Sequence, residues 1–353
     1  MIKINTKLLK LFTLIICLFC IFTFQKSNYI SIRNTIGLFL DSVMPSLFPF
    51  ILFTNILILS GISKYITNYF KKYGNLIYVS IIGFFCGYPM GAKATYTLFS
   101  EGKITKKQAS FLMSFANNCN PIFILSTIGI CILDNIYIGL ILLISHYIAA
   151  IIICIFNFTH NDIIHEKIEN SNIFKKKEDK NLHKSTFEIL DLSIKSTFVT
   201  LGNILAFIIL FNLCFSIIEI ILTKLNISKN IIYSLSGLFE ITNGTRLIYL
   251  NTNFSFPFTI ALISFMLSFS GFSIIFQVYS CIYKAKIKLL YIVKNKFIQG
   301  IISGIITYFL INFSNIKNIE HTNIIKFNAT SYFIISVSLL FMFVFALKKV
   351  TRK

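Results

Sequence analysis

The segment Gly87-Tyr88-Pro89-Met90-Gly91-Ala92-Lys93 lies inside an apolar stretch and combines helix-breaking glycine and proline with a lysine. These breakers divide residues 76–101 into two limbs of about 10 residues each. A helix needs roughly 20 apolar residues to cross a bilayer, so neither limb is long enough. Irregular backbone at membrane depth is tolerated only where it lines a cavity or is buried in protein. We therefore predict a re-entrant hairpin over 76–101.

A second interruption of the same kind, Thr242-Asn243-Gly244-Thr245, lies in the stretch 231–256. The two halves of the chain align at an offset of about 154 residues, and Lys93 and Arg246 then occupy equivalent places. Each half has the order helix, hairpin, broken helix. An odd number of crossings separates the two copies, which predicts that the second copy is inverted. Inverted repeats with discontinuous helices are typical of secondary transporters.

The composition indicates a polytopic membrane protein. Of 353 residues, 56% are hydrophobic and 13% are charged, whereas soluble domains contain about 25% charged residues. The net charge of +20 does not indicate a nucleic-acid partner. The lysines lie in short segments between apolar runs, as the positive-inside rule predicts for a protein whose partner is the lipid bilayer.

The distribution of positive charge decides the number of crossings. Ten full crossings would leave almost no asymmetry between the two sides. With two hairpins and eight crossings, 25 of the 33 Lys and Arg residues lie on one side, 6 on the other and 2 at the hairpin tips. We therefore predict an all-α protein with about eight transmembrane helices and both termini in the cytoplasm. The ten apolar runs are 8–24, 36–60, 76–92, 108–130, 137–157, 197–222, 231–250, 258–283, 296–313 and 330–347.

The run 8–24 has three lysines at its amino end (Lys3, Lys7 and Lys10) and is followed by Gln25-Lys26 without a small-residue cleavage site, which predicts a retained signal anchor. The predicted divisions of the chain are the anchor helix and a loop (1–35), a first repeat with a connecting helix (36–157), a cytoplasmic loop (158–196), a second repeat (197–283), and C-terminal helices with a basic tail (284–353).

Lys93 and Arg246 are the sharpest candidates for substrate binding, because charges within a membrane are costly and usually functional. Each follows a tip glycine, Gly91 or Gly244, at the amino end of a hairpin limb, where free N–H groups favour anions. Two cations converging from opposite faces on one cavity would suit a small anion such as a dicarboxylate. The alternative is that Lys93 extends to the surface and Arg246 pairs with Glu240. Glu240 would then hold Arg246 in place, or it would bind a coupling cation or proton.

Amides form a second group of candidates. Asn117, Asn118 and Asn120 precede the helix-breaking Pro121, and Asn243 lies at the second tip. Such a break exposes carbonyl groups and polar side chains to a cavity. Polar side chains also join helices to one another inside a membrane, and the sequence leaves both roles open for the asparagines.

No enzyme or metal site is indicated. All eight cysteines lie in apolar segments, and the pair Cys17 and Cys20 lacks neighbouring ligands for a metal. Walker, HExxH and GxSxG motifs are absent from the sequence. We therefore expect neither a cofactor nor catalysis.

Four segments of the chain combine helix breakers with polar residues: Met44-Pro45-Ser46-Leu47-Phe48-Pro49-Phe50, residues 87–93, Ala116-Asn117-Asn118-Cys119-Asn120-Pro121 and Ser236-Gly237-Leu238-Phe239-Glu240-Ile241-Thr242-Asn243-Gly244. Together they resemble the sporulation integral membrane protein family YlbJ, also called SpoVV, and the resemblance covers nearly the whole chain. It implies two nucleoside-recognition (Gate) domains, a fold like that of concentrative nucleoside transporters, and a role in forming the spore cortex. It also implies transport of dipicolinic acid across the outer forespore membrane.

These observations favour a transporter of a small anion, with dipicolinate as the substrate that the resemblance implies. Two alternatives stay open: a nucleoside transporter, and a membrane scaffold for spore assembly that transports nothing. The sequence leaves the coupling ion, the direction of transport and the oligomeric state undetermined.

Overall fold

The computed structural model describes residues 23–61, 63–70, 73–159 and 185–314, and within them the chain is helical and contains no strand. Most of the predicted anchor helix, the last apolar run 330–347 and the basic tail lie outside the described residues.

The first half begins with a continuous helical segment of 35 residues, Gln25–Leu59. The sequence predicted a loop before residue 36, but residues 25–35 are helical. They belong to the helix Gln25–Leu38, which packs along the helix Thr186–Lys224 of the second half. The elements are α2 (Gln25–Leu38), the π-helical turn η1 (Phe39–Val43), α3 (Met44–Leu59), α4 (Ser63–Tyr69), α5 (Gly74–Phe85), α6 (Met90–Ser100), α7 (Lys106–Phe115), the π-helix η3 (Phe123–Ile132) and α8 (Ile136–Thr159).

The second half follows the same order: a long helix, two short helices, an interrupted helix and another long helix. Its first helix starts at residue 186, inside the predicted cytoplasmic loop, because Ser185 caps it by accepting from the backbone N–H of Glu188. The elements are α9 (Thr186–Lys224), α10 (Lys229–Phe239), α11 (Ile241–Asn251), α12 (Phe256–Phe269), α13 (Gly271–Ile282), the short η4 (Tyr283–Ala285) and α14 (Leu289–Phe313).

Five helical segments are long and apolar enough to cross a membrane, which agrees with an integral membrane protein. The eight crossings and the re-entrant, inverted repeats stay predictions. The five segments are Gln25–Leu59, Ile136–Thr159, Thr186–Lys224, Phe256–Ala285 and Leu289–Phe313.

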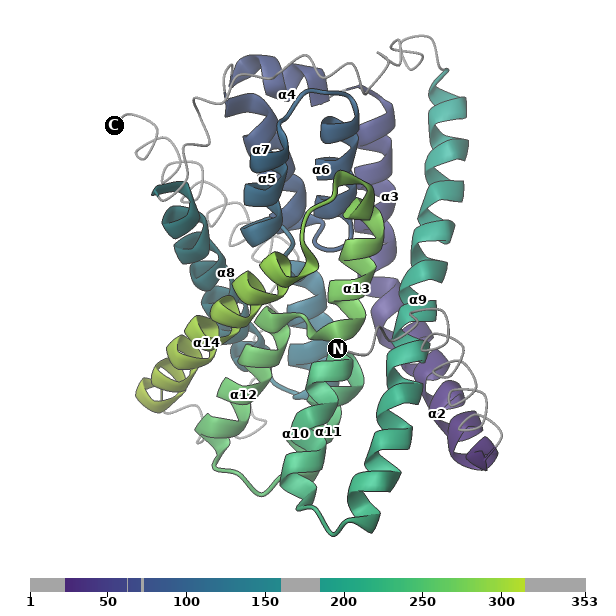
Figure 1. Cartoon of the computed structure of the whole chain (residues 1–353), viewed down its shortest axis with the longest axis vertical. Coiled ribbons are helices and arrows are strands. Elements are labelled where there is room, and N and C mark those ends of the chain that lie inside the picture. The colour runs from purple at the N-terminus through teal and green to yellow at the C-terminus, as the bar shows by residue number, and fades with distance from the viewer. Residues whose placement is uncertain (1–22, 62, 71–72, 160–184, 315–353) are drawn as a thin grey trace, which may run out of the picture.

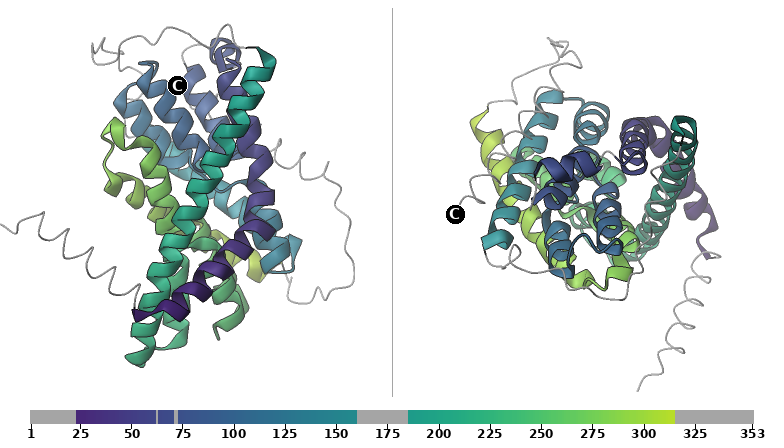
Figure 2. Two further views of the ribbon diagram at one scale, coloured as in Figure 1. Left: turned by 90° about the vertical axis from the view of Figure 1, so that its right-hand side faces the viewer. Right: turned by 90° about the horizontal axis from the view of Figure 1, so that it is seen from above.

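The two pairs of short helices approach the middle of the molecule from opposite ends. Figure 1 shows α5, α6 and α7 in the upper half, and α10, α11 and α12 in the lower half. The left view of Figure 2 shows α9 running along the length of the molecule, with α2 crossing its lower part. Because α2 and α9 are in contact, they form one wall beside the lower pair of helices.

The interruptions differ between the two pairs. In the first, residues 86–89 separate α5 from α6, and Gly87 adopts a φ of +70° that favours glycine. In the second, Glu240 alone separates α10 from α11. The predicted interruption at 242–245 was therefore wrong, since these residues form the first turns of α11. Gly244 instead permits close packing, because a Cβ there would lie 2.4 Å from the Cα of Gly237.

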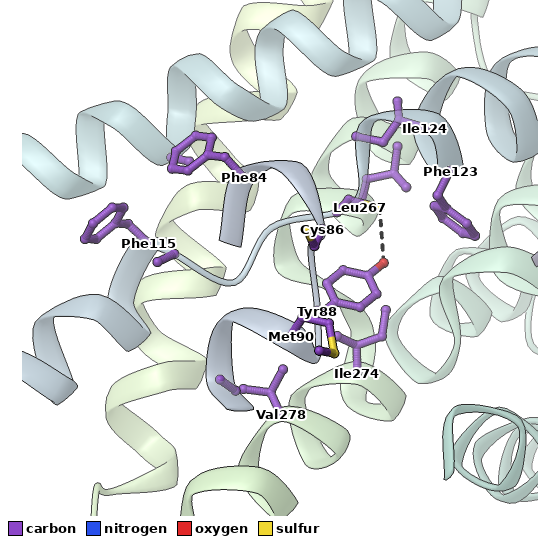
Figure 3. Packing of buried hydrophobic residues seen from close by; sticks show 14 of the residues in the cluster. Phe84, Cys86, Tyr88, Met90, Phe115, Phe123, Ile124, Leu267, Ile274 and Val278 are labelled. Atoms are coloured by element: carbon purple, nitrogen blue, oxygen red, sulfur yellow. Dashed lines mark hydrogen bonds between the residues drawn. The ribbon is translucent and has the colours of Figure 1, made fainter. Parts of the chain in front are cut away.

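The first interruption packs against the second broken helix. Figure 3 shows Tyr88 and Met90 among Leu267, Ile274 and Val278, which come from α12 and α13. The Tyr88 hydroxyl and the sulfur of Cys119 share a hydrogen bond at 3.1 Å, so the first hairpin also contacts the break after α7. The centre of the molecule is therefore the place where the interrupted elements of both halves meet.

Substituting Gly83 tests this packing. A Cβ at Gly83 would lie 1.7 Å from the carbonyl oxygen of Ala116, so α5 or the break after α7 must move. We expect Gly83→Ala to destabilise the protein by about 1–3 kcal/mol, seen as a lower Tm in detergent. The control is Gly202→Ala in α9, where a Cβ meets nothing within 4 Å. Equal Tm values for the two variants would contradict the close approach.

Candidate functional site

A cavity of about 410 Å³ lies between α2, α9 and α11. Its lining combines one guanidinium and one carboxylate with amides, hydroxyls and apolar side chains. The lining residues are Ser27, Ile30, Ser31, Asn34, Thr35 and Leu38 of α2, Asn212, Phe215, Ser216 and Glu219 of α9, and Asn243, Arg246, Leu247, Leu250 and Asn251 of α11.

Two hydrogen bonds hold α2 against α9 at this cavity. The amide of Asn212 donates to the hydroxyl of Thr35 at 3.0 Å, and the hydroxyls of Ser27 and Ser216 lie 2.9 Å apart. Asn212 and Thr35 are both buried. The cavity wall is thus joined by side-chain contacts between segments far apart in the sequence.

Arg246 lines the cavity from the second turn of α11 and is an exposed residue. Within the described part of the chain, it makes no ion pair with Glu240. The alternative in which these two residues pair is therefore not what the structure shows. A guanidinium that faces a polar cavity is available to bind a carboxylate through two parallel hydrogen bonds.

Glu240 caps α11. Its two carboxylate oxygens accept from the backbone N–H groups of Thr242 at 2.9 Å and Asn243 at 2.8 Å, and its side chain is buried. Since these are the N–H groups that an anion would use at a helix amino terminus, Glu240 already occupies that position. The expectation that the amino end of α11 is free was therefore wrong.

Lys93 lies elsewhere. Its ammonium donates to the Oδ1 of Asn55 on α3 and to the Oγ of Ser196 on α9, both at 2.8 Å. It is half-buried and does not line the cavity that contains Arg246. The structure thus does not bring the two cations together in one cavity. Lys93 instead joins the first pair of short helices to the long helices.

The asparagines after α7 join helices. Asn118 donates to the carbonyl of Phe115 and accepts from Gln299 of α14. Asn120 donates to the carbonyl of Phe85 and caps the following helix by accepting from the N–H of Ile122 at 2.8 Å.

Asn117 accepts through its backbone carbonyl from Lys296 of α14. Gly91 packs beside the same break, since a Cβ there would lie 2.3 Å from the carbonyl oxygen of Ala116. Of the predicted binding residues, only Arg246 and Asn243 line the cavity.

Lys296 was not among the predicted site residues. The sequence analysis counted Lys296 among the 25 Lys and Arg residues on one side of the membrane. The structure instead places it inside α14 with 2% of its surface exposed. The signal in the sequence was its place at the start of the apolar run 296–313, one turn before Gln299. No group of three metal-ligating side chains occurs in the described ranges.

Comparison with known proteins gives one informative relative. No protein-family profile matches the chain, and no solved structure matches it. The chain is 26% identical over 341 residues to "Sporulation integral membrane protein YlbJ" of Bacillus subtilis (strain 168), which covers 87% of this chain and 83% of the relative. This similarity supports membership of the YlbJ family.

The segments that resemble the YlbJ family lie where the helices are interrupted. Residues 87–93 contain the first interruption and the start of α6, and residues 116–121 form the break after α7. Residues 236–244 surround Glu240, and residues 44–50 begin α3 directly after η1. These segments therefore correspond to places where backbone groups need partners outside a regular helix.

Removing the cap of α11 should destabilise the protein. Glu240→Ala leaves the N–H groups of Thr242 and Asn243 without acceptors, which costs about 1–2 kcal/mol. Glu240→Gln keeps one acceptor oxygen and should lose less. Thermal unfolding in detergent measures the order of the three proteins. A Glu240→Ala protein as stable as the wild type would show that the cap is unimportant.

Proposed function

We propose that this chain is a sporulation-associated membrane transporter for a small anion, with dipicolinic acid as the expected substrate and the outer forespore membrane as its place of action. The observation that carries the proposal is the guanidinium of Arg246 facing a polar cavity of about 410 Å³. That volume lies within the range of small-molecule sites, about 300–1,000 Å³.

Three further observations support the proposal. The curated relative is named as an integral membrane protein of sporulation. Five described helical segments have the length and hydropathy to cross a membrane. The chain contains two pairs of short helices and two interrupted helices, and such discontinuous helices form the substrate sites of many secondary transporters.

The lining suits a flat anion with two carboxylates. Arg246 would bind one carboxylate through both of its terminal N–H groups, because a charge-assisted bidentate pair is strong and directional. The amides of Asn243 and Asn251 would donate to the second carboxylate. Phe215 and Leu247 would contact the faces of the aromatic ring. Dipicolinate presents this combination of an aromatic ring and two carboxylates.

Glu219 gives the same cavity a negative charge. A carboxylate near a bound dianion disfavours binding through like-charge repulsion. Protonation of Glu219, or a cation held beside it, would remove the repulsion. Glu219 is therefore the residue through which a proton or cation would be coupled to the anion.

The amide-rich lining also favours a second candidate, a nucleoside. Asn34, Asn212, Asn243 and Asn251 offer donors and acceptors that would suit a neutral ribose and base. Competition between uridine and dipicolinate for uptake separates the two substrates. The scaffold alternative differs from both, because it predicts that variants of the cavity still form normal spores.

Arg246 should be essential for uptake. Purified protein in liposomes is expected to take up dipicolinate, and Arg246→Ala should reduce uptake roughly 10- to 100-fold, because a charge-assisted contact is lost. Arg246→Lys should retain part of the activity. The matched control is Lys224→Ala, an exposed cation at the end of α9.

Two results would contradict the proposal. Uptake no greater than in empty vesicles, under every ion gradient, would argue against transport. Wild-type uptake by Arg246→Ala would place the substrate elsewhere. In cells, the dipicolinate content of spores from a deletion strain complemented with each variant should follow the same order.

Glu219→Gln should increase the affinity for the dianion. Removing about 1 kcal/mol of like-charge repulsion lowers the KM for dipicolinate roughly fivefold. The dependence of uptake on a proton gradient should weaken in the same variant. An unchanged KM and an unchanged gradient dependence would show that Glu219 does not face the bound anion.

A further inference from the structure

The buried lysine Lys296 lies in the first third of α14, beside the break after α7. Only 2% of its surface is exposed. Its ammonium donates to the backbone carbonyl of Asn117 and, at 2.9 Å, to the side-chain oxygen of Gln299. Both partners are neutral, and no carboxylate pairs with Lys296 anywhere in the described ranges. Burying an ammonium without a counter-ion is costly, and within the described residues only neutral polar groups offset that cost.

The break after α7 supplies that environment. The helix ends at Phe115, and residues 116–120 are not helical, so the negative end of the helix dipole lies beside the carbonyl of Asn117. The side-chain Oδ1 of Asn117 is also buried and has no hydrogen-bond donor. That oxygen lies next to Gly91 of α6, so the acceptor of Asn117 that Lys296 uses is the backbone carbonyl.

The side chain of Gln299 is oriented so that its oxygen accepts from Lys296. Its side-chain nitrogen donates to the Oδ1 of Asn118 at 3.1 Å and lies 3.4 Å from the backbone oxygen of His146. Because the nitrogen of the amide has these acceptors, the amide oxygen is directed to Lys296. The break, α8 and α14 thus share one hydrogen-bonded network around a single ammonium.

His146 adds no charge to this network. The backbone N–H of Cys119 donates to its Nε2 at 3.1 Å, so that nitrogen carries no proton. The proton is on Nδ1, which lies 2.7 Å from the hydroxyl of Ser268 and donates to it. His146 is therefore neutral, and Lys296 is the basic side chain of the cluster that can carry a positive charge.

We propose that the break between α7 and η3 is a cation site and that the ammonium of Lys296 is its resident cation. In discontinuous membrane helices, unwound carbonyls and the carboxyl ends of half-helices coordinate Na⁺ or protonated groups. Here the carbonyl of Asn117 has that position, and the cation is tethered to α14. The site has no need of a metal ion, so Na⁺ neither stabilises the protein through this site nor drives transport through it. Only the statement about transport rests on the proposed function.

Thermal unfolding in detergent tests the proposal without any substrate, so it can be interpreted even if dipicolinate transport is wrong. The Tm of the wild type should be the same in NaCl, choline chloride and propylammonium chloride at equal ionic strength. Lys296→Ala should lower the Tm by roughly 5 °C, because two buried acceptors lose their donor. Propylammonium, which supplies the atoms that the substitution removes, should restore at least half of that loss.

Lys294→Ala is the matched control, because Lys294 is exposed on the same helix; its Tm should equal that of the wild type. Lys296→Met keeps the length of the chain without the charge and should have a lower Tm that propylammonium does not restore. A wild-type Tm for Lys296→Met, or a Lys296→Ala protein that does not respond to propylammonium, would overturn the proposal. If neither neutral variant accumulates, the wild type still tests the proposal. A higher Tm in NaCl than in choline chloride would show that the site is not already filled, and would overturn the proposal.

Discussion

An interrupted helix inside an apolar interior leaves backbone N–H and C=O groups that water cannot reach, and each must find a partner within the protein. This constraint explains where the polar side chains of this chain lie. The carboxylate of Glu240 accepts from two N–H groups of α11. The Oδ1 of Asn120 accepts from the N–H of Ile122, and the carbonyl of Asn118 accepts from the N–H of Tyr88. The interruptions persist because these partners are present.

The same constraint separates two kinds of buried charge. Glu240 and Lys296 interact with backbone groups at the ends of interrupted helices, so their charges are balanced by peptide dipoles rather than by opposite charges. Lys93 is held by two neutral side chains of neighbouring helices. Arg246 and Glu219 are the charged residues that line the polar cavity. A ligand would therefore meet those two charges, while the others maintain the fold.

The first interruption and the break at Pro121 were predictable from the sequence. The exact place of the second interruption, at Glu240, and the partners of most polar side chains were not. Glycine and proline near Gly87 and Pro121 act on the adjacent backbone, so the short helix pairs and the breaks follow from residues close in sequence. Lys93 contacts Ser196, and Lys296 contacts Asn117, across long separations that no periodic pattern encodes. Arg246 was a candidate because a charge in an apolar stretch is costly, but the lining of the cavity beside it depends on how α2 packs.

The presence of one cation and one carboxylate in the lining of the same cavity has a consequence for a transporter. Two convergent cations would hold a dianion tightly and slow its release, since each charge-assisted contact contributes about 1.5–3 kcal/mol. Arg246 alone, opposed by Glu219, gives binding that is weaker and that depends on the charge of the carboxylate. A substrate must leave the site as readily as it enters, so a cavity of mixed charge fits the proposed transport better than the doubly cationic cavity that the equivalent tips predicted.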